Sequence, residues 1–240
     1  MTATQHLILN PNVRRAVVLA ASISVATLLG SCGDAAQNEI GSDPTPTEPF
    51  DVSAGLRNAL SSAASHQVTA TDQSGTTTVR LTISPKGEVT LTDGSVVNST
   101  ESVNQTTSPS GAVTESKTIT HWVKDTANND RIRIVSVATP AANVFLDVTS
   151  HTDLPGPVLV NTNGSYYDGP VTQNTTRLGS ASVNWALQAN DAQTAWACTV
   201  ATTTYSAGIF SDCYLINMAG ELQGRYKSII SEGSQGVIFQ

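Results

Sequence analysis

The stretch "WACTVATTTYSAGIFSDCYLI", residues 196–216, contains two apolar, β-branched runs that a short turn separates. The turn is expected at residues 205–208, where small residues and a glycine interrupt the runs. Cys198 and Cys213 lie nearly symmetrically about this turn. Because directly opposed residues of two antiparallel strands come within bridging distance, the spacing predicts a hairpin in which the two cysteines face each other.

Much of the remaining chain shows the same alternation of apolar and polar residues. The segments "TTTVRLTIS" (76–84), "SVVNSTESVNQTT" (95–107) and "AVTESKTITHWV" (112–123) are typical of strands. The first of them, the turn "SPKGE" (84–88) and the following "VTLTD" (89–93) predict one hairpin, and the other two, separated by "SPSG" (108–111), predict a longer second one. Strands of this length without helical crossovers predict an antiparallel sheet and disfavour a parallel α/β enzyme fold.

One segment, residues 51–65, predicts a helix. Ser53 is a candidate N-cap, and Leu56 and Leu60 lie along one face of the expected helix. We therefore expect a mainly β fold with one short N-terminal helix. A single antiparallel meander over residues 51–240 would form a sandwich, a strongly curved sheet or a barrel.

The composition is poor in charge and acidic in balance. Charged residues make up 13% of the chain, against a typical value of about 25%. The formal net charge is −7 at pH 7. An acidic surface with few lysines repels phosphate backbones, so we expect no nucleic-acid partner. The same balance argues against a basic surface patch as a membrane anchor.

The N-terminus has the three parts of a secretory signal peptide. Arg14 and Arg15 supply the positive part, and an apolar run of fourteen residues follows at 16–29. A spanning helix needs about 20 apolar residues, so this run is too short to cross a membrane. A twin-arginine export signal is an alternative, but "NVRRAVVLA" lacks the rest of that motif.

The run ends in Leu29-Gly30-Ser31-Cys32, which resembles the lipobox of bacterial lipoproteins. The resemblance covers residues 1–33 alone. It implies a signal peptide at 1–31 that is cleaved before Cys32, and a diacylglycerol on the Cys32 thiol with further acylation, such as palmitate, at the new amino terminus. Two or three acyl chains are enough for stable membrane attachment. Because Gly33 and not Asp follows the cysteine, the outer membrane of the cell envelope is favoured. The alternative is an ordinary signal peptide with an incidental Cys32.

Residues 32–50 predict a disordered tether between the anchor and the folded part. The segment "GDAAQNEIGSDPTPTEPF" is rich in Pro, Ser, Thr and acids and has no hydrophobic period. An exported chain meets an oxidising compartment, where Cys198 and Cys213 are expected to pair as a structural disulfide. A catalytic or metal-binding cysteine pair is disfavoured, because the sequence has no CxxC motif and no histidine near either residue.

Residues 151–175 form the main irregular region of the sequence and are the predicted binding loop. The adjacent Tyr166 and Tyr167 look exposed, and Asn163 and Asp168 add polar groups. The expected partner is an envelope protein, a polymer or a small apolar ligand. In the alternative, the loop is a plain connection whose tyrosines cover the open end of the core. The three tryptophans are expected in the core, not as sugar-stacking platforms: Trp122, Trp185 and Trp196.

Catalytic motifs are absent from the sequence. It has no GxSxG, HExxH, P-loop or dinucleotide-binding glycine pattern. His66, His121 and His151 are scattered singly, and His151 with Asp153 could orient a general base. The segment "DTANND" (125–130) has oxygen ligands of the kind that calcium prefers, but it is also typical of a polar hairpin turn. We expect neither a cofactor nor a metal.

Two functional classes follow from these observations. The favoured one is a membrane-anchored envelope lipoprotein with a non-enzymatic β domain for binding or structure. The alternative is an envelope hydrolase with a dispersed His/Asp site. The hydrolase requires His121, His151, Asp153 and the tyrosine pair to converge on one pocket.

Overall fold

The computed structural model describes residues 46–125, 131–232 and 235–240. The predicted signal peptide, Cys32 and most of the predicted tether lie outside the described residues. The last tether residue, Phe50, belongs to the folded part, since its side chain is fully buried and its backbone pairs with Val158. Among the described residues, no helix has the length and apolarity that crossing a bilayer requires.

The described chain is mostly strand. The regular elements are α2 (Val52–Ser61), the 3-10 helix η2 (Pro140–Ala142), β1 (Phe50–Asp51), β2 (Ala64–Asp72), β3 (Gly75–Thr90), β4 (Val96–Thr107), β5 (Val113–Asp125), β6 (Arg131–Thr139), β7 (Val144–Asp147), β8 (Ser150–His151), β9 (Pro157–Val158), β10 (Thr162–Gln173), β11 (Thr176–Ala189), β12 (Thr194–Thr203), β13 (Gly208–Asn217), β14 (Leu222–Glu232) and β15 (Gln235–Phe239).

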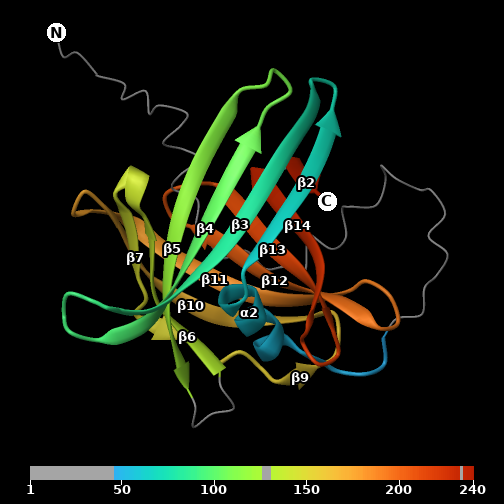
Figure 1. Ribbon diagram of the computed structural model, residues 1–240, viewed down its shortest axis with the longest axis horizontal. Coiled ribbons are helices and arrows are strands. Elements are labelled where there is room, and N and C mark those ends of the chain that lie inside the picture. The colour runs from blue at the N-terminus through green and yellow to red at the C-terminus, as the bar shows by residue number, and fades with distance from the viewer. Residues whose placement is uncertain (1–45, 126–130, 233–234) are drawn as a thin grey trace.

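Twelve strands form one antiparallel sheet that curls into a nearly closed, barrel-like shape (Figure 1). Their order is β15-β14-β13-β12-β11-β10-β7-β6-β5-β4-β3-β2, and β8 pairs separately with β10. The first and last strands meet where Thr69 and Gln240 exchange backbone hydrogen bonds of 3.3 and 3.2 Å. The predicted antiparallel meander with one short helix is therefore confirmed, and its shape is barrel-like.

The helix α2 packs between opposite walls of the sheet. It contacts β3 and β6 on one wall and β12, β13 and β14 on the other (Figure 1). A Cβ at Gly55 would lie 3.0 Å from the Ile216 side chain, so the close approach favours glycine there. Asn58 Nδ2 donates to the carbonyl of Gly220 at 2.9 Å, across 162 residues of chain. The helix thus connects the N-terminal part of the described chain to strands near its C-terminus.

The ends of α2 differ from the prediction. The N-cap is Asp51, whose carboxylate accepts the backbone N–H of Ala54 at 2.9 Å, while the predicted cap Ser53 lies buried inside the helix. The helix stops at Ser61, because Ser62 is extended and β2 begins two residues later. The β-branched residues that follow favour the strand.

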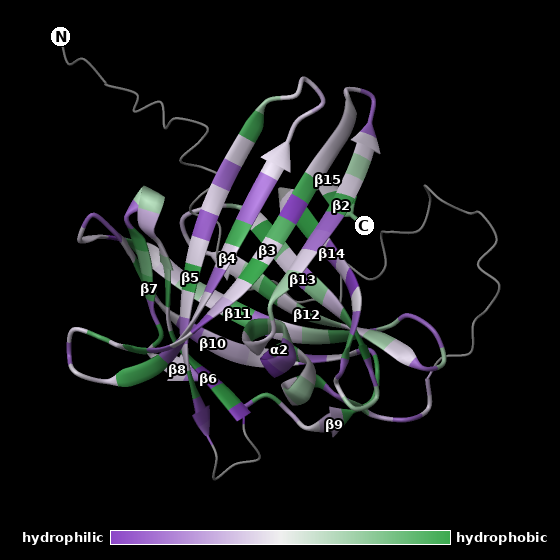
Figure 2. Ribbon diagram, viewed as in Figure 1, coloured by the Kyte–Doolittle hydropathy of each residue, from purple (hydrophilic) through white to green (hydrophobic). Residues whose placement is uncertain are grey.

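Two buried clusters face the inside of the sheet. The main core surrounds α2 and joins it to β6 and β10–β13; its largest fully buried side chains include Phe50, Ile132, Leu154, Leu187 and Ile216. The smaller seam core lies where the first and last strands meet, and consists of Val68, Val79, Leu81, Ile83, Tyr226 and Phe239. Figure 2 shows the alternation of hydrophilic and hydrophobic residues along strands such as β3 and β5, which gives each strand an inner and an outer face.

One predicted turn is wrong. The segment 84–88 does not end a hairpin, because β3 runs through it and pairs with β4 along both halves. A register shift between Pro85 and Gly87 marks a β-bulge, and Gly87 has a φ of 76°, a conformation that favours glycine. The Pro and Gly that indicated a turn lie at this bulge instead. The other predicted turn, at 108–111, does join two strands, β4 and β5.

Candidate ligand pocket where β6 and β8 diverge

The predicted binding loop is mostly strand, and its tyrosines are buried. Residues 162–173 form β10, and Tyr166 and Tyr167 are only 2% and 8% exposed within the main core. Their predicted exposure is therefore wrong, and the packing alternative describes their location. Asn163 and Asp168, on the same strand, are exposed. All three tryptophans are buried, as expected.

A β-bulge explains how two adjacent tyrosines become buried together. Strand β10 shifts register against β11 between Ser165 and Tyr167, so that Tyr166 is the extra residue. In a regular strand, neighbouring side chains point to opposite faces, and one of the two rings would face solvent. Here the two rings contact each other with centroids 4.9 Å apart. Burial raises the pKa of both phenols well above the usual value.

The sheet opens beside these tyrosines because β6 and β8 diverge. β6 pairs with β7 from Ser136 to Thr139, and one further bond runs from the Val148 N–H to the Val135 carbonyl at 3.2 Å. The chain then moves away from β6 and pairs with β10 as β8. Gly169 of β10 lies at this junction, where an added Cβ would be 1.8 Å from the carbonyl oxygen of Asp147. No side chain fits there, so the crossing of the strands depends on this glycine.

A pocket of about 250 Å³ occupies the opening. Its wall combines apolar side chains, two hydroxyls, an arginine and a histidine from β5, β6, β8 and the segment before β8: Val123, Arg133, Ile134, Val135, Val148, Thr149, Ser150 and His151. The pocket exists because two neighbouring strands of the sheet separate.

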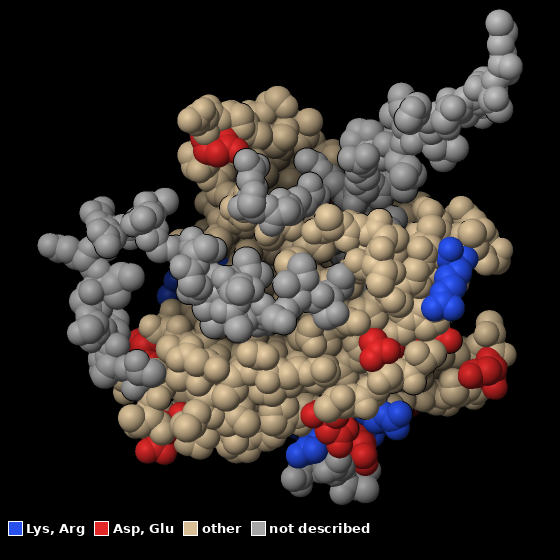
Figure 3. All heavy atoms as spheres, turned by 180° about the vertical axis from the view of Figure 1, so that it is seen from behind, with Lys and Arg blue, Asp and Glu red and all other residues tan. Residues whose placement is uncertain are grey.

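Charged residues gather around the pocket. Arg131 Nη1 lies 3.4 Å from a carboxylate oxygen of Asp153, whose other oxygen lies 3.7 Å from His151 Nδ1. Arg133 lines the pocket, is exposed, and forms no ion pair with any described residue. On the face that Figure 3 displays, Lys, Arg, Asp and Glu atoms gather at the lower edge, and further charged groups lie along the right, upper left and lower left edges. The pocket is thus lined and flanked by charged residues, in a chain of which only 13% of the residues are charged.

His151 is the most constrained side chain of the pocket. Its side chain is 8% exposed, its ring packs edge-on against Tyr166 with centroids 5.5 Å apart, and its Nε2 is buried without a hydrogen-bond partner among the described residues. Burial lowers the pKa of His151, and the positive charge of Arg133 lowers it further. Asp153 and a hydrogen bond with the backbone of Ile132 act in the opposite direction. The lowered pKa favours a neutral ring at pH 7.

Only part of the predicted His/Asp constellation converges. His151, Asp153 and the tyrosines lie together, but His121 does not line the pocket, and its Nδ1 lies 3.0 Å from the Ser136 hydroxyl. His66 lies against the seam core, stacked on Tyr226 at 5.3 Å. The sequence interpretation missed the two arginines of β6. Their signal was the alternation "RIRIV", which places both arginines on the face opposite the buried isoleucines.

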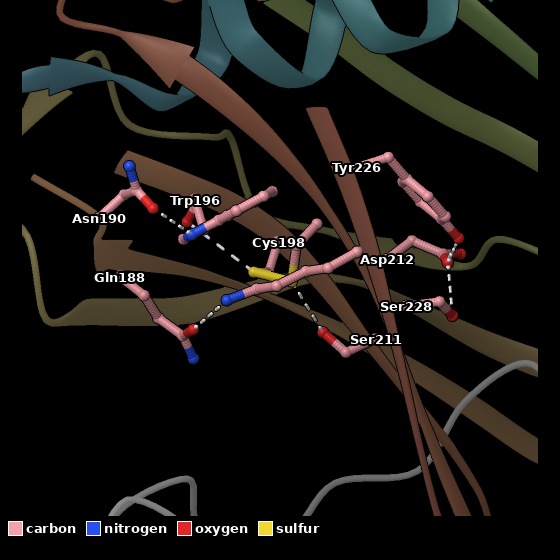
Figure 4. Close-up of a disulfide and its surroundings, with 10 residues drawn as sticks. Gln188, Asn190, Trp196, Cys198, Ser211, Asp212, Tyr226 and Ser228 are labelled. Atoms are coloured by element: carbon pink, nitrogen blue, oxygen red, sulfur yellow. Dashed lines mark hydrogen bonds between the residues drawn. A yellow bond between two sulfur atoms is a disulfide. The ribbon is translucent and has the colours of Figure 1, made fainter. Parts of the chain in front are cut away.

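The predicted disulfide is present in the predicted register. Cys198 and Cys213 are directly opposed on β12 and β13, with Cα atoms 4.0 Å apart (Figure 4). The bond is buried on the outer face of the sheet beside Trp196, whose indole N–H donates to Asn190 at 3.1 Å. Lys227 lies over the Trp196 ring, 4.5 Å from its centroid. These contacts indicate a structural role for the disulfide.

A half-buried carboxylate lies on the same two-strand region, facing inward. Asp212 of β13 accepts hydrogen bonds from the hydroxyls of Tyr226 and Ser228, the latter at 3.3 Å (Figure 4). Burial raises the pKa of Asp212, while these two hydrogen bonds act to lower it. The negative charge of Asp212 in turn helps to raise the pKa of Tyr226.

No metal centre is found in the described part of the chain, where no group of three or more His, Cys, Asp or Glu side chains could hold an ion. Residues 126–130 of the candidate calcium segment lie outside the described residues. Comparison with known proteins adds no identity. No family model matches the chain, and neither a curated protein nor a solved structure is significantly similar to it.

Proposed function

We propose that this chain is a lipid-anchored protein of the bacterial cell envelope whose barrel-like domain binds a small ligand without transforming it. The observation that carries the binding role is the pocket where β6 and β8 diverge, with Arg133 and His151 on its wall. Concave sites that combine apolar walls with a few polar groups are typical of ligand sites. The anchoring role rests on the lipobox resemblance at residues 29–32.

The disulfide supports the proposed location in the cell envelope. Structural disulfides form and persist in oxidising compartments such as the periplasm or the cell surface. Cys198 and Cys213 are directly opposed and bonded, and the remaining cysteine, Cys32, is the one that the lipobox resemblance assigns to lipid.

The hydrolase remains the second candidate, because His151 and Asp153 lie side by side. A carboxylate beside Nδ1 orients an imidazole so that Nε2 can accept a proton. However, Nε2 of His151 is buried, and no nucleophile is hydrogen-bonded to it among the described residues. A base that substrate cannot reach does not support turnover, so we favour binding.

The anchor is tested by metabolic labelling. Cells that express the full chain are grown with a clickable palmitate analogue, and the labelled protein is compared with Cys32→Ala. We expect label on the wild type and none on the variant, which should also stay unprocessed. Ser31→Ala is the matched control, because it keeps a small residue before the cysteine and should be labelled normally. Equal labelling of wild type and Cys32→Ala contradicts the anchor.

The pocket is tested by filling it. Thr149 is exposed on the pocket wall, so Thr149→Trp places an indole in the opening. Thr152→Trp makes the same change at an exposed position off the wall and is the control. Native mass spectrometry of full-length protein from envelope extracts should show a small bound molecule on wild type and Thr152→Trp, and its loss from Thr149→Trp. Equal retention by both variants contradicts the site.

The same preparations separate binding from catalysis. The co-purified molecule should be recovered unchanged after prolonged incubation with the purified protein. Conversion by wild type that His151→Ala abolishes would replace the binding function with the hydrolase.

A further inference from the structure

We infer that the pocket takes a small organic anion, whose carboxylate or phosphate group pairs with Arg133. This ligand class rests on the proposed binding function and makes it specific. The starting point is the difference between the two arginines of β6. Arg131 is already paired with Asp153 at 3.4 Å, whereas Arg133 has no ion pair with a described residue.

The chain has few cations, so an arginine at a pocket without an ion pair to any described residue is informative. The chain has 12 Lys and Arg residues against 19 Asp and Glu residues. In an acidic protein, an arginine is readily satisfied by a neighbouring carboxylate. Arg133 instead faces the opening, and no carboxylate of the described residues lines the pocket. A planar guanidinium in this position matches the geometry of carboxylate or phosphate oxygens.

The other lining residues indicate the chemistry of the part of the ligand that does not carry the anionic group. Thr149 and Ser150 offer hydroxyls, and the lining residues other than these two, Arg133 and His151 are apolar: Val123, Ile134, Val135 and Val148. The volume of about 250 Å³ lies below the usual range of roughly 300–1,000 Å³ for ligand pockets. The ligand is therefore small, with one anionic group and a short apolar part, such as a short-chain carboxylate.

His151 should respond to the anion. Among the described residues, Arg133, Asp153 and the backbone of Ile132 act on the pKa of His151, and the ring of Tyr166 packs against it. The charge of Arg133 lowers the pKa of His151, and a bound anion beside Arg133 offsets that charge. Anion binding therefore favours protonation of His151, so the affinity should rise as the pH falls below 6.5, the ordinary pKa of histidine.

The experiment is a calorimetric titration of the full-length protein in detergent, after removal of the co-purified molecule. The probes are acetate, butyrate and inorganic phosphate, with butyramide as the uncharged analogue of butyrate. We expect butyrate to bind more tightly than acetate, and butyramide to bind at least about tenfold more weakly than butyrate. Phosphate distinguishes a purely anionic site from one that also uses the apolar wall.

The residue assignment is tested by Arg133→Gln, which keeps hydrogen bonding and removes the charge. It should weaken butyrate binding by about tenfold or more and flatten the pH dependence. The control is Arg80→Gln on β3, an exposed arginine off the pocket wall, which should change the affinity by less than about twofold.

Three results overturn the inference, and they differ from failure of the proposed function. Butyramide that binds as tightly as butyrate, or Arg133→Gln that binds butyrate normally, shows that the site does not select an anion. Saturable binding by none of the three anions also overturns it. In each case the pocket itself still stands if Thr149→Trp loses the co-purified molecule and Thr152→Trp keeps it.

Discussion

The main core and the seam core hold the same sheet together by different means. The main core surrounds a helix that contacts opposite walls, and a disulfide cross-links two of its strands on the outer face. The seam core joins the first and last strands, which share one backbone pair, Thr69 with Gln240. The difference indicates that closure of the barrel is the weaker part of the fold, while the helix-filled part supplies most of its stability.

A matched pair of phenylalanines gives the largest expected effect. Phe50 is fully buried in the main core, and Phe239 is buried at the end of the five-residue strand β15. Phe50→Ala should lower the free energy of unfolding by about 3–5 kcal/mol, because neighbours on several elements cannot collapse into the space. Phe239→Ala should cost less, because a short edge strand can shift. Urea denaturation followed by circular dichroism measures both, and equal losses would contradict the ranking of the two cores.

Loss of the disulfide should have the second largest effect. Replacing Cys198 and Cys213 with serine should lower the free energy of unfolding by about 2–4 kcal/mol, because the unfolded chain regains the freedom of the closed loop. Ser211→Ala, which removes only a hydroxyl beside Cys213, is the control and should have a small effect. Non-reducing mass spectrometry should find the linked peptides in protein from the envelope. Free thiols in that protein would show that the bond is absent in the cell.

Two proline substitutions in β2 measure how much the backbone pair between Thr69 and Gln240 contributes to stability. The N–H of Thr69 donates to Gln240, so Thr69→Pro removes a bond across the seam and should cost about 1 kcal/mol. The N–H of Ala70 points the other way, towards β3, because alternate residues of a strand bond to opposite sides. Ala70→Pro should therefore be the more damaging change. If the two variants lose the same free energy of unfolding, the contact between the first and last strands contributes as much to stability as the pairing of β2 with β3.

The smallest effect concerns the carboxylate beside the seam core. Burial raises the pKa of Asp212 above its unfolded value, so its contribution to stability is present at low pH and is lost as the pH rises through the folded pKa. Asp212→Asn should therefore stabilise the protein at pH 7, by up to about 1 kcal/mol, and the gain should vanish near pH 3. Denaturation curves at several pH values measure this.

Asp93→Asn is the control with the opposite sign. Hydrogen bonds from the side chain and backbone of Ser95 lower the pKa of Asp93, so its contribution is present at neutral pH and is lost on acidification. This variant should be less stable than wild type at pH 7 and equal to it at low pH. A gain at pH 7 from Asp93→Asn would show that removal of negative charge in general, and not burial at Asp212, stabilises the protein.

Local sequence patterns predicted the parts of this fold that are themselves local. Two β-branched runs around a turn were enough to place Cys198 opposite Cys213, and the apolar spacing located α2 to within a few residues. The closure between Thr69 and Gln240 could not be predicted, since it joins opposite ends of the sheet and leaves no periodic signal.

Two of the errors, the turn predicted at 84–88 and the predicted exposure of the tyrosines, have a common physical origin in β-bulges. A bulge let β3 pass through a Pro-Gly segment that has turn composition, and another turned Tyr166 and Tyr167 to the same face. Alternation cannot reveal either bulge, because it assumes that every strand residue has one partner. The pocket has a different origin, since it forms where β6 and β8 separate. The alternation along a single strand does not show where two strands separate. His151 and Asp153 were visible as neighbours in sequence, but only the diverging strands place Arg133 beside them.

The position of α2 in the chain also sets the order of events in folding. The helix is made early during synthesis, yet the carbonyl that Asn58 contacts follows 162 residues later. A nascent chain therefore holds an amphipathic helix without its partners until the last strands have emerged, and the sheet cannot close around it sooner. For a chain that is exported, as we propose, this delay keeps the polypeptide in the unfolded state that passage through a translocation channel requires.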